Sequence, residues 1–414
     1  MPSKVKAEDL IVVLDAPELG PARPAGVLSF WPDSGAVAFV YARSWLESSE
    51  GFDLEPRLPR VEGYQYFAGS APPPILGDTS PDSWGVRLME RRAGRGLNPW
   101  LLLTGVDDQT RMGALRLRRG VNGSFVDDSE PAIPPLAKLS ALEAAAMAFE
   151  MNPEAPIDDP NLELLLAPGS SLGGARPKAN FRDPDASLWI AKFPSRTDRA
   201  DIAAWEYVYA ELAREAGIEV AETRLLSLGE GGRTFATRRF DRDGTSRRLY
   251  ASAMTLAQRS DGEEASYLDI AHAIRRFGAA ASVRDDLEQL FRRLAFNILA
   301  GNRDDHLRNH AFLCTPAGWR LSPAFDMNPG RAERQHSISI DGETTAPDLG
   351  AALATRQVYG LSETRARAII LEVAGVLQHW PEVATRNGIP KSEQRVIAGA
   401  LSALPSGLAL AAPE

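Results

Sequence analysis

The chain has 414 residues, of which 44% are hydrophobic and 24% charged, as in an ordinary soluble globular protein with a sizeable core. Its net charge of −9 and pI near 5.3 argue against a dedicated nucleic-acid-binding protein, which normally carries a basic surface. A single cysteine, Cys314, excludes a disulfide framework, and no run approaches about 18 apolar residues, so we expect a cytoplasmic protein without membrane contact.

The first third of the chain is predicted to be a mixed α/β domain that ends near residue 125. Short apolar runs separated by Gly and Pro predict strands. These runs are 11–14, 25–30, 36–41 and 112–117. A helix is predicted over 84–92, and residues 121–135, rich in Gly, Ser, Asp and Pro, predict a linker.

The middle of the chain, residues 126–242, is predicted to form a second mixed domain. The Ala-rich run 141–151 predicts a helix, and Ser140 and Glu143 have the spacing of a capping box at its start. The run 188–193 predicts a strand. A further helix is predicted over 201–215, with apolar residues at helical spacing and Gly217 as its end.

The rest of the chain, residues 243–414, is predicted to form an all-helical C-terminal lobe apart from the short hairpin described below. The clearest helix is 285–300, where apolar residues keep one face and two aspartates open the first turn. Gly301 ends this helix and residues 302–309 form a loop. The runs 311–314 and 319–321 then predict two short strands joined by a tight turn.

The loop 302–309 carries the strongest chemical pattern. Transfer of a phosphoryl group from ATP needs a carboxylate that orients the attacking hydroxyl and oxygen ligands for Mg²⁺. Protein kinases supply them as Asp-x-x-x-x-Asn followed by a metal-binding Asp. Asp304 and Asn309 have this offset, and Asp326 follows the predicted hairpin. The alternative interpretation is a polar loop that caps a core helix.

A kinase also needs a lysine that holds the ATP phosphates. Lys192 ends a predicted strand on the same side as two apolar residues, and a lysine that faces a core needs a partner. Glu206 in the following helix is a candidate partner. The alternatives are that Lys192 lies in solvent at the strand end and that Glu206 faces water.

A glycine-containing loop precedes Lys192 in the sequence. It combines Ser170, Ser171, Gly173 and Gly174 with Lys178 just before a predicted strand. Glycines let backbone N–H groups approach phosphates closely. The segment is neither of the common phosphate-loop motifs, and by itself its composition also suits an ordinary loop.

Together these segments resemble the HipA family of serine/threonine kinases, the toxins of bacterial type II toxin–antitoxin modules. The family's loop pattern Ser-x-x-Gly-Ala-x-x-Lys is matched by Ser171, Gly174, Ala175 and Lys178. Its catalytic pattern Asn-x-Asp-x-His-x-x-Asn is matched by Asn302, Asp304, His306 and Asn309, and its metal-binding aspartate by Asp326. Residues 238–241 resemble its hinge, and 81–85 and 113–116 resemble its amino-terminal subdomain.

The resemblance implies an α+β, two-lobed protein-kinase-like fold and a role for each matching residue. Asp304 is expected to be the catalytic base, and Asn309 and Asp326 the ligands of Mg²⁺. The residues expected around ATP are Gly173, Gly174, Ala175, Arg176, Pro177, Lys178, Lys192, Arg238, Arg239, Phe240, His306, Leu307, Arg308, Asn309 and Asp326. Ser171, or its neighbour Ser170, is expected to be autophosphorylated, which silences the kinase because the added charge repels ATP.

The resemblance also implies partners. A HipB-type DNA-binding antitoxin is expected to restrain the toxin, so this chain would meet DNA only through it. The expected substrate is a translation factor such as an aminoacyl-tRNA synthetase. The chain departs from the family at Arg238, where an acidic residue is common, but backbone groups make the adenine contact there.

Two other functions fit part of the pattern. Small-molecule phosphotransferases of the antibiotic-modifying kind share the Asp, Asn and Asp arrangement, but they usually carry His two residues before the first Asp, where this chain has Asn302. A catalytically silent subunit of a DNA-bound repressor complex is the non-enzymatic alternative, against which the acidic composition argues.

Overall fold

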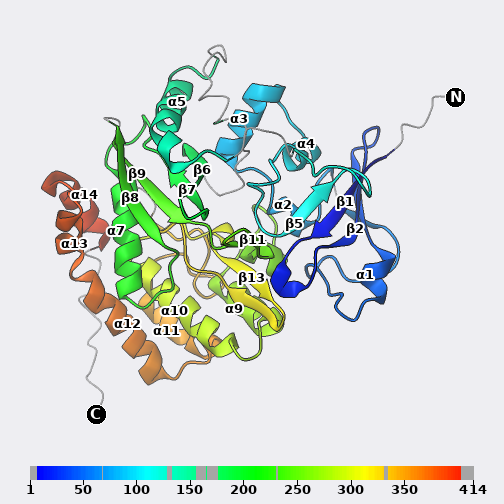
Figure 1. Cartoon of the computed structure of the whole chain (residues 1–414). Coiled ribbons are helices and arrows are strands. Elements are labelled where there is room, and N and C mark those ends of the chain that lie inside the picture. Colours follow the sequence, from blue (N-terminus) through cyan, green and yellow to red (C-terminus); the bar gives the residue numbers. More distant parts are fainter. Residues whose placement is uncertain are drawn as a thin grey trace. The chain divides into compact units, whose positions relative to one another are not determined.

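The computed structural model describes residues 7–67, 69–127, 133–154, 165, 176–229, 232–330 and 334–401 (Figure 1). The chain divides into two compact units. The first comprises residues 1–196 and 241–251, and the second comprises residues 197–240 and 252–414. The predicted domain boundaries near residues 125 and 242 stay predictions.

The first unit is built on a five-stranded antiparallel sheet with the order β4-β3-β2-β1-β5. Its strands are β1 (Glu8–Leu14), β2 (Arg23–Trp31), β3 (Ala36–Tyr41), β4 (Gln65–Phe67) and β5 (Leu115–Arg118). The three earliest predicted strands are therefore confirmed, and the fourth begins later than predicted. Val12, Leu28 and Phe39 are fully buried, so one face of the sheet packs on a core.

Short helices and the β6–β7 hairpin accompany this sheet in the described part of the first unit. The helices are α1 (Arg43–Glu47), α2 (Pro74–Gly77), α3 (Ser83–Ala93), α4 (Pro99–Thr104) and α5 (Leu139–Met151), with 3-10 turns at Pro17–Leu19 and Leu136–Lys138. Helix α5 begins before Ser140, and its N-cap Lys138 makes no side-chain cap bond, so the predicted capping box is wrong. Strands β6 (Lys178–Arg182) and β7 (Leu188–Lys192) form an antiparallel hairpin. Strand β7 confirms the strand predicted over 188–193.

A buried polar contact inside the first unit joins Gly113, from the 113–116 segment, to Asp241, the last residue of the predicted hinge. The Asp241 carboxylate, 1% exposed, accepts the backbone N–H of Gly113 at 2.7 Å. Arg247 donates to the carbonyl oxygens of Arg111 and Gly113, both at 3.2 Å. The strands β10 (Arg242–Asp243) and β11 (Ser246–Arg247), which form a small hairpin, are thereby fixed to the segment before β5.

The second unit is mainly helical. Its helices are α7 (Ile202–Glu215), α8 (Ala253–Leu256), α9 (Tyr267–Phe277), α10 (Val283–Ala300), α11 (Leu349–Ala354), α12 (Glu363–Leu377), α13 (Trp380–Arg386) and α14 (Lys391–Leu401), with 3-10 turns at Leu307–Asn309 and Arg356–Tyr359. Helix α10 is the core helix, and α9, α11 and α12 pack against it (Figure 1). The predicted helices 201–215 and 285–300 are confirmed.

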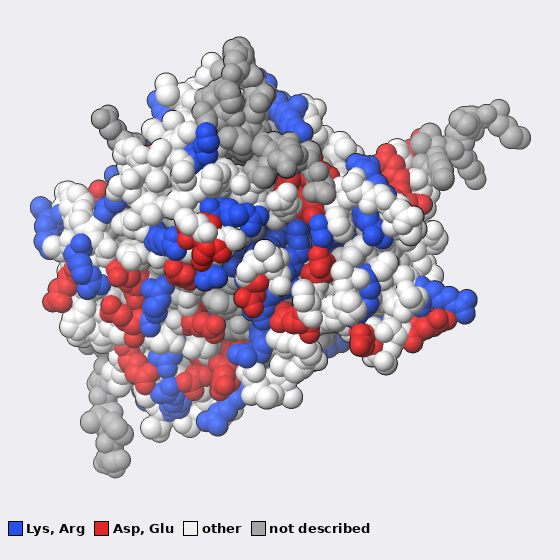
Figure 2. Space-filling model, in the orientation of Figure 1, with Lys and Arg blue, Asp and Glu red and all other residues white. Residues whose placement is uncertain are grey.

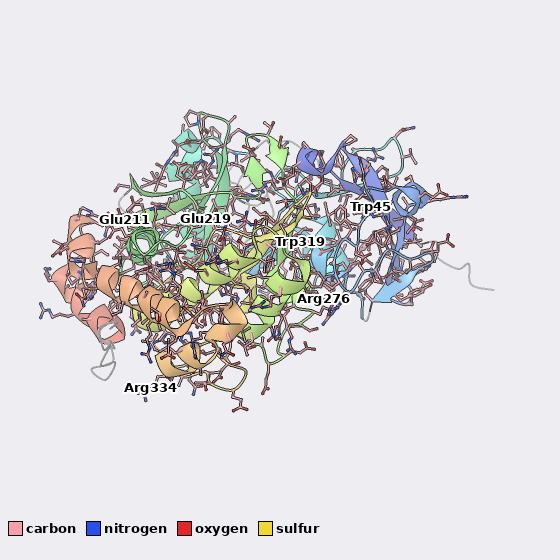
Figure 3. All side chains as sticks on the ribbon, turned by 90° about the horizontal axis from the view of Figure 1, so that it is seen from below. Trp45, Glu211, Glu219, Arg276, Trp319 and Arg334 are labelled. Atoms are coloured by element: carbon pink, nitrogen blue, oxygen red, sulfur yellow. The ribbon has the colours of Figure 1, made fainter. Side chains whose placement is uncertain are left out.

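Two hairpins accompany these helices. They are formed by β8 (Thr223–Gly229) with β9 (Gly232–Arg238) and by β13 (Ala311–Thr315) with β14 (Gly318–Leu321), and the short strand β12 (Tyr250–Ser252) spans the division between the units. Helix α9, which carries Arg276, and β14, which carries Trp319, lie side by side (Figure 3). The carbonyl oxygen of Trp319 accepts the N–H of Ala279 at 2.9 Å just beyond α9. The predicted hairpin after the 302–309 loop is thus confirmed and is held against a helix. Residues 243–414 are therefore not all-helical, because β12, β13 and β14 form a small sheet there.

The surface of α12 mixes both signs of charge. Arg365 pairs with Glu372 at 2.8 Å, and Arg367 pairs with Glu363 at 2.8 Å. On the face in Figure 2, basic and acidic side chains are likewise interspersed over this region. Such a mixture does not create the single-sign field that steers nucleic acid to a surface.

None of the helices in the described part of the chain is long and apolar enough to cross a membrane.

Replacing Asp241 by alanine is expected to destabilise the protein. The change leaves the buried Gly113 N–H and the neighbouring Arg242 guanidinium without their carboxylate, at a cost of about 3 kcal/mol. Urea denaturation of the full chain measures it. Asp243→Ala, two residues away on an exposed position, is the matched control and should change the free energy of unfolding by less than about 0.5 kcal/mol. Equal losses in the two variants would contradict this account.

Candidate active site

The 302–309 loop begins where α10 ends. Gly301 adopts the left-handed conformation, with φ of 74°, that commonly terminates a helix. The amide nitrogen of the Asn302 side chain donates to Asn297 Oδ1 at 3.1 Å, which ties the first loop residue back to the last turns of the helix. Arg303, also buried, donates to the carbonyl oxygen of Asn297 at 2.8 Å. The start of the loop is therefore fixed to a core helix.

Asp305 anchors the middle of the loop. Its side chain is fully buried and accepts hydrogen bonds from three donors. The Tyr267 hydroxyl donates at 2.7 Å, His336 Nδ1 at 2.7 Å and the Ser337 backbone N–H at 3.1 Å. A buried carboxylate is stable only when hydrogen bonds replace its lost hydration, and Asp305 meets that condition.

The direction of these hydrogen bonds follows from Arg303. Its Nη1 lies 2.9 Å from Nε2 of His336, and a guanidinium has only donors, so Nε2 accepts. The proton of the imidazole therefore lies on Nδ1 and is donated to Asp305. Arg303, His336 and Asp305 thus form a chain of hydrogen bonds with one possible direction.

Tyr267 closes the polar network on the other side of Asp305. Burial and the adjacent Asp305 charge raise the pKa of the Tyr267 hydroxyl well above its ordinary value, so it stays a donor. The Asn297 side chain donates in turn to the Tyr267 oxygen at 2.8 Å. Residues from α9, α10, the loop and the segment at 336 therefore share one buried network.

Asp304 differs completely from its neighbour Asp305. Its side chain is 74% exposed, and its Oδ1 lies 3.8 Å from Nε2 of His306. The loop backbone beside it is held by Asn309, whose Nδ2 donates to the Asp304 carbonyl oxygen at 2.6 Å. That bond uses the nitrogen of the Asn309 amide and leaves Oδ1 as the atom able to bind a cation.

Asp326 follows β14 in an unusual backbone conformation. Its φ of 56° lies in the left-handed region, which is uncommon for a residue other than glycine and often marks functional positions. The preceding Phe325 ring packs on Phe240 with centroids 5.4 Å apart. Ala324 N–H donates to the Glu219 carbonyl oxygen at 2.7 Å, so the two residues before Asp326 are each held by a contact.

A small cavity of about 10 Å³ lies between the loop and the segment of Asp326. Its wall includes Asn302, Asp305 and Asn309 from the loop, and Phe325 and Met327 from beside Asp326. The two segments predicted to carry the chemistry therefore meet within the second unit.

His310 and Arg293 line the same cavity and shape its electrostatics. Burial, assisted by the Arg293 cation, lowers the pKa of His310 to about 3, so its imidazole is neutral near pH 7. Burial also lowers the pKa of Arg293 to about 10, which still leaves it charged. The cavity wall thus carries the positive charge of Arg293 together with the Asp305 carboxylate.

The predicted phosphate-binding residues belong to the first unit. Ser170, Ser171, Gly173, Gly174 and Ala175 lie outside the described residues. Arg176 Nη2 donates to the Phe193 carbonyl at 3.2 Å, and Pro177 accepts the N–H of Phe193 at 2.8 Å. Lys178 and Lys192 are directly opposite each other in the β6–β7 hairpin, so their side chains leave the same face.

The remaining predicted residues belong to the second unit. Arg238 ends β9 and lies 3.5 Å from Glu222, Arg239 is 2% exposed, and Leu307 is 4% exposed. Arg308 pairs with Asp261 at 2.7 Å. Glu206 lies in α7 and is 3% exposed, so it does not face water. Its proposed pairing with Lys192 stays a prediction.

Three residues of the site, Asp305, Tyr267 and His336, were not predicted from the sequence. Asp305 was hidden because the kinase spacing picks out its neighbour Asp304. Tyr267 and His336 lie more than 30 residues from Asp305 in opposite directions along the chain, so no local pattern joins them. Their only signal was that a buried acid needs donors from elsewhere.

Comparisons with known proteins agree on one group. The family model described as HipA-like C-terminal domain matches residues 170–380, just over half of the chain. The serine/threonine-protein kinase toxin HipA of Shewanella oneidensis is 23% identical over 355 residues, which cover 77% of this chain and 76% of that protein. "Putative kinase Y4dM" of Sinorhizobium fredii is 26% identical over 273 residues, 62% of this chain and 61% of that protein.

One solved structure matches nearly the whole chain. A chain of the Shewanella oneidensis MR-1 complex of HipA, HipB and operator DNA aligns with a TM-score of 0.69 and 19% identity, over 95% of each chain. This likeness confirms the predicted α+β, kinase-like fold.

The stability of the protein is expected to depend on Asp305 but not on its neighbour Asp304. Asp305→Asn places an amide where a buried carboxylate accepts three hydrogen bonds, and should lower the free energy of unfolding by about 3 kcal/mol. Asp304→Asn removes an exposed charge and should change it by less than about 0.5 kcal/mol. Urea denaturation measures both. A stable Asp305→Asn variant would show that the network does not hold the loop.

Proposed function

The chain belongs to the HipA family, and we propose that it is an ATP-dependent protein kinase that phosphorylates a serine or threonine. The observation that carries this proposal is the contrast between two neighbouring carboxylates. Asp305 is buried and fixed by three hydrogen bonds, while the Asp304 side chain is 74% exposed. A rigid loop that presents one carboxylate to a substrate hydroxyl suits phosphoryl transfer, which depends mainly on positioning.

Asp304 is the proposed catalytic base. The hydroxyl of the acceptor serine or threonine forms the new bond to the γ-phosphorus, and the bond from that phosphorus to the bridging oxygen of ADP breaks. The hydroxyl proton passes to the Asp304 carboxylate, and the leaving ADP keeps the bridging electron pair. His306, 3.8 Å from Asp304 and half-exposed, is proposed to lie beside the nucleotide.

Asn309 and Asp326 are the proposed ligands of Mg²⁺. Among the described residues, no group of three His, Cys, Asp or Glu side chains could hold a metal ion. Mg²⁺ bound with ATP needs only one or two protein ligands, because phosphates and water complete its shell. An amide oxygen and a carboxylate oxygen are suitable donors, and the ion would neutralise charge on the transferred phosphoryl group.

The finer roles follow from the family. We propose that the protein is the toxin of a HipA/HipB-type module, restrained by a DNA-binding antitoxin through which it meets DNA. Its substrate would be a translation factor such as an aminoacyl-tRNA synthetase. Ser171 or Ser170 would be phosphorylated by the kinase itself. The named S. oneidensis toxin supports the proposed toxin activity, and the complex of HipA with HipB and operator DNA supports the proposed antitoxin partner.

The proposal predicts that purified protein transfers the γ-phosphate of labelled ATP to protein in the presence of Mg²⁺. Asp304→Asn should lower the labelling rate about 100-fold or more, the range of a lost general base, and Asp326→Asn should do the same through the metal. Asp285→Asn, an exposed aspartate in the first turn of α10, is the control and should label at the normal rate.

The chemical class of the acceptor separates the alternatives. Label on small alcohols but not on protein would identify a small-molecule phosphotransferase. If the wild-type protein transfers no label and yet binds antitoxin on DNA, it is a silent repressor subunit. Phosphoproteomics of cells that express wild type or Asp304→Asn would identify the protein substrate.

A further inference from the structure

The motif 81–85, which the proposed chemistry does not use, contacts one of the predicted nucleotide-binding lysines. Asp82 Oδ2 lies 2.7 Å from Lys178 Nζ, and both side chains are buried, with exposures of 4% and 1%. Trp84 Nε1 donates to the Lys178 carbonyl oxygen at 3.1 Å. Lys178 is therefore held by both its side chain and its backbone at the start of β6.

Asp82 and Trp84, which contact Lys178, are themselves held by neighbouring groups. Asp82 is the N-cap of α3, where its Oδ1 accepts the Gly85 N–H at 2.7 Å. Trp84 is fully buried, and its ring meets Phe149 of α5 edge-on at 5.5 Å. One carboxylate thus caps a helix with one oxygen and neutralises a buried ammonium with the other, and two helices fix the indole.

The hairpin extends this constraint to Lys192. Lys178 and Lys192 are opposite residues of β6 and β7, and two lysines on the same face repel each other. The Asp82 charge offsets that repulsion, and the register of the hairpin links the positions of the two lysines. The hairpin therefore gives a route by which a change in how α3 holds Lys178 would reach the residue that is proposed to contact phosphate.

We propose that Asp82 and Trp84 are positioning residues for nucleotide binding, which act by holding Lys178 and, through the hairpin, Lys192. This inference rests on the proposed ATP-dependent function. It gives α3, in the amino-terminal part of the chain, an indirect effect on affinity for ATP, exerted through the two lysines. It also explains why a buried lysine, otherwise costly, stands at the beginning of β6.

The test compares Asp82→Asn and Trp84→Phe with wild type in the full chain. Asparagine can still accept the Gly85 N–H but carries no charge, and phenylalanine keeps a ring against Phe149 but loses the N–H donor. Both variants should raise the KM for Mg-ATP, by about tenfold for Asp82→Asn, with kcat at saturating ATP within about twofold of wild type. A general loss of structure would instead lower kcat as well.

The pairing itself is tested by a double-mutant cycle. Lys178→Met should raise the KM for ATP, and Asp82→Asn should add nothing further in the Lys178→Met background. Asp348→Asn, which replaces the exposed N-cap of α11, is the matched control for the capping change and should leave the KM unchanged. Unchanged KM in Asp82→Asn, or effects that multiply in the double mutant, would overturn the proposal.

Hydrogen exchange separates this inference from the proposed function. In nucleotide-free protein, Asp82→Asn should speed amide exchange of the peptide 178–182 at least several-fold, without changing that of α10. This measurement needs no kinase activity. If the wild-type protein binds no ATP, the proposed kinase function is refuted, but the effect of the Asp82–Lys178 contact can still be measured. Unchanged exchange at 178–182 would show that Asp82 does not hold the strand.

Discussion

A carboxylate removed from water must find donors within the protein, and Asp305 finds them on two segments remote in sequence. The Tyr267 hydroxyl comes from α9, and His336 and Ser337 come from beyond the β13–β14 hairpin. Because Arg303 donates to the far side of the imidazole, the network has a single direction. The loop that carries Asp304 is therefore held by interactions that a local rearrangement cannot replace.

Two consecutive residues of this loop have different tasks: Asp305 supports the fold, and Asp304 is proposed to react. The Asp305 carboxylate accepts hydrogen bonds from three groups of the core, so it is poorly placed to bind a substrate. Asp304 points outward, and Asn309 holds its backbone with the amide nitrogen. An enzyme that works chiefly by positioning benefits from this division, since the rigid residue need not react and the reacting residue need not support the fold.

The sequence predicted most of what depends on local order. The helix 285–300, the stop at Gly301 and the hairpin over 311–321 follow from periodicity and turn residues, and the structure confirms them. The capping box at Ser140 failed because Leu139, which is fully buried, extends the helix before it. At this position the burial of the Leu139 side chain outweighed the preference of Ser140 for a capping position.

Contacts between residues far apart in the chain could not be predicted from the sequence. Asp82 and Lys178 lie in different predicted domains, and no spacing rule joins them. Lys178 was expected at the nucleotide from the glycine-containing loop and the family pattern, and the structure adds a buried carboxylate beside it. The roles of Asp304, Asn309 and Asp326 remain predictions that the geometry of the second unit supports.

A crystal structure of the full chain with Mg²⁺ and a non-hydrolysable ATP analogue tests the central claim most directly. The account predicts a metal ion bound by Asn309 Oδ1 and the Asp326 carboxylate, with the γ-phosphate near Asp304. Asp305 should keep its hydrogen bonds to Tyr267 and His336 in that complex. A metal ion bound by Asp305, or a nucleotide bound away from Asp304, would contradict the account.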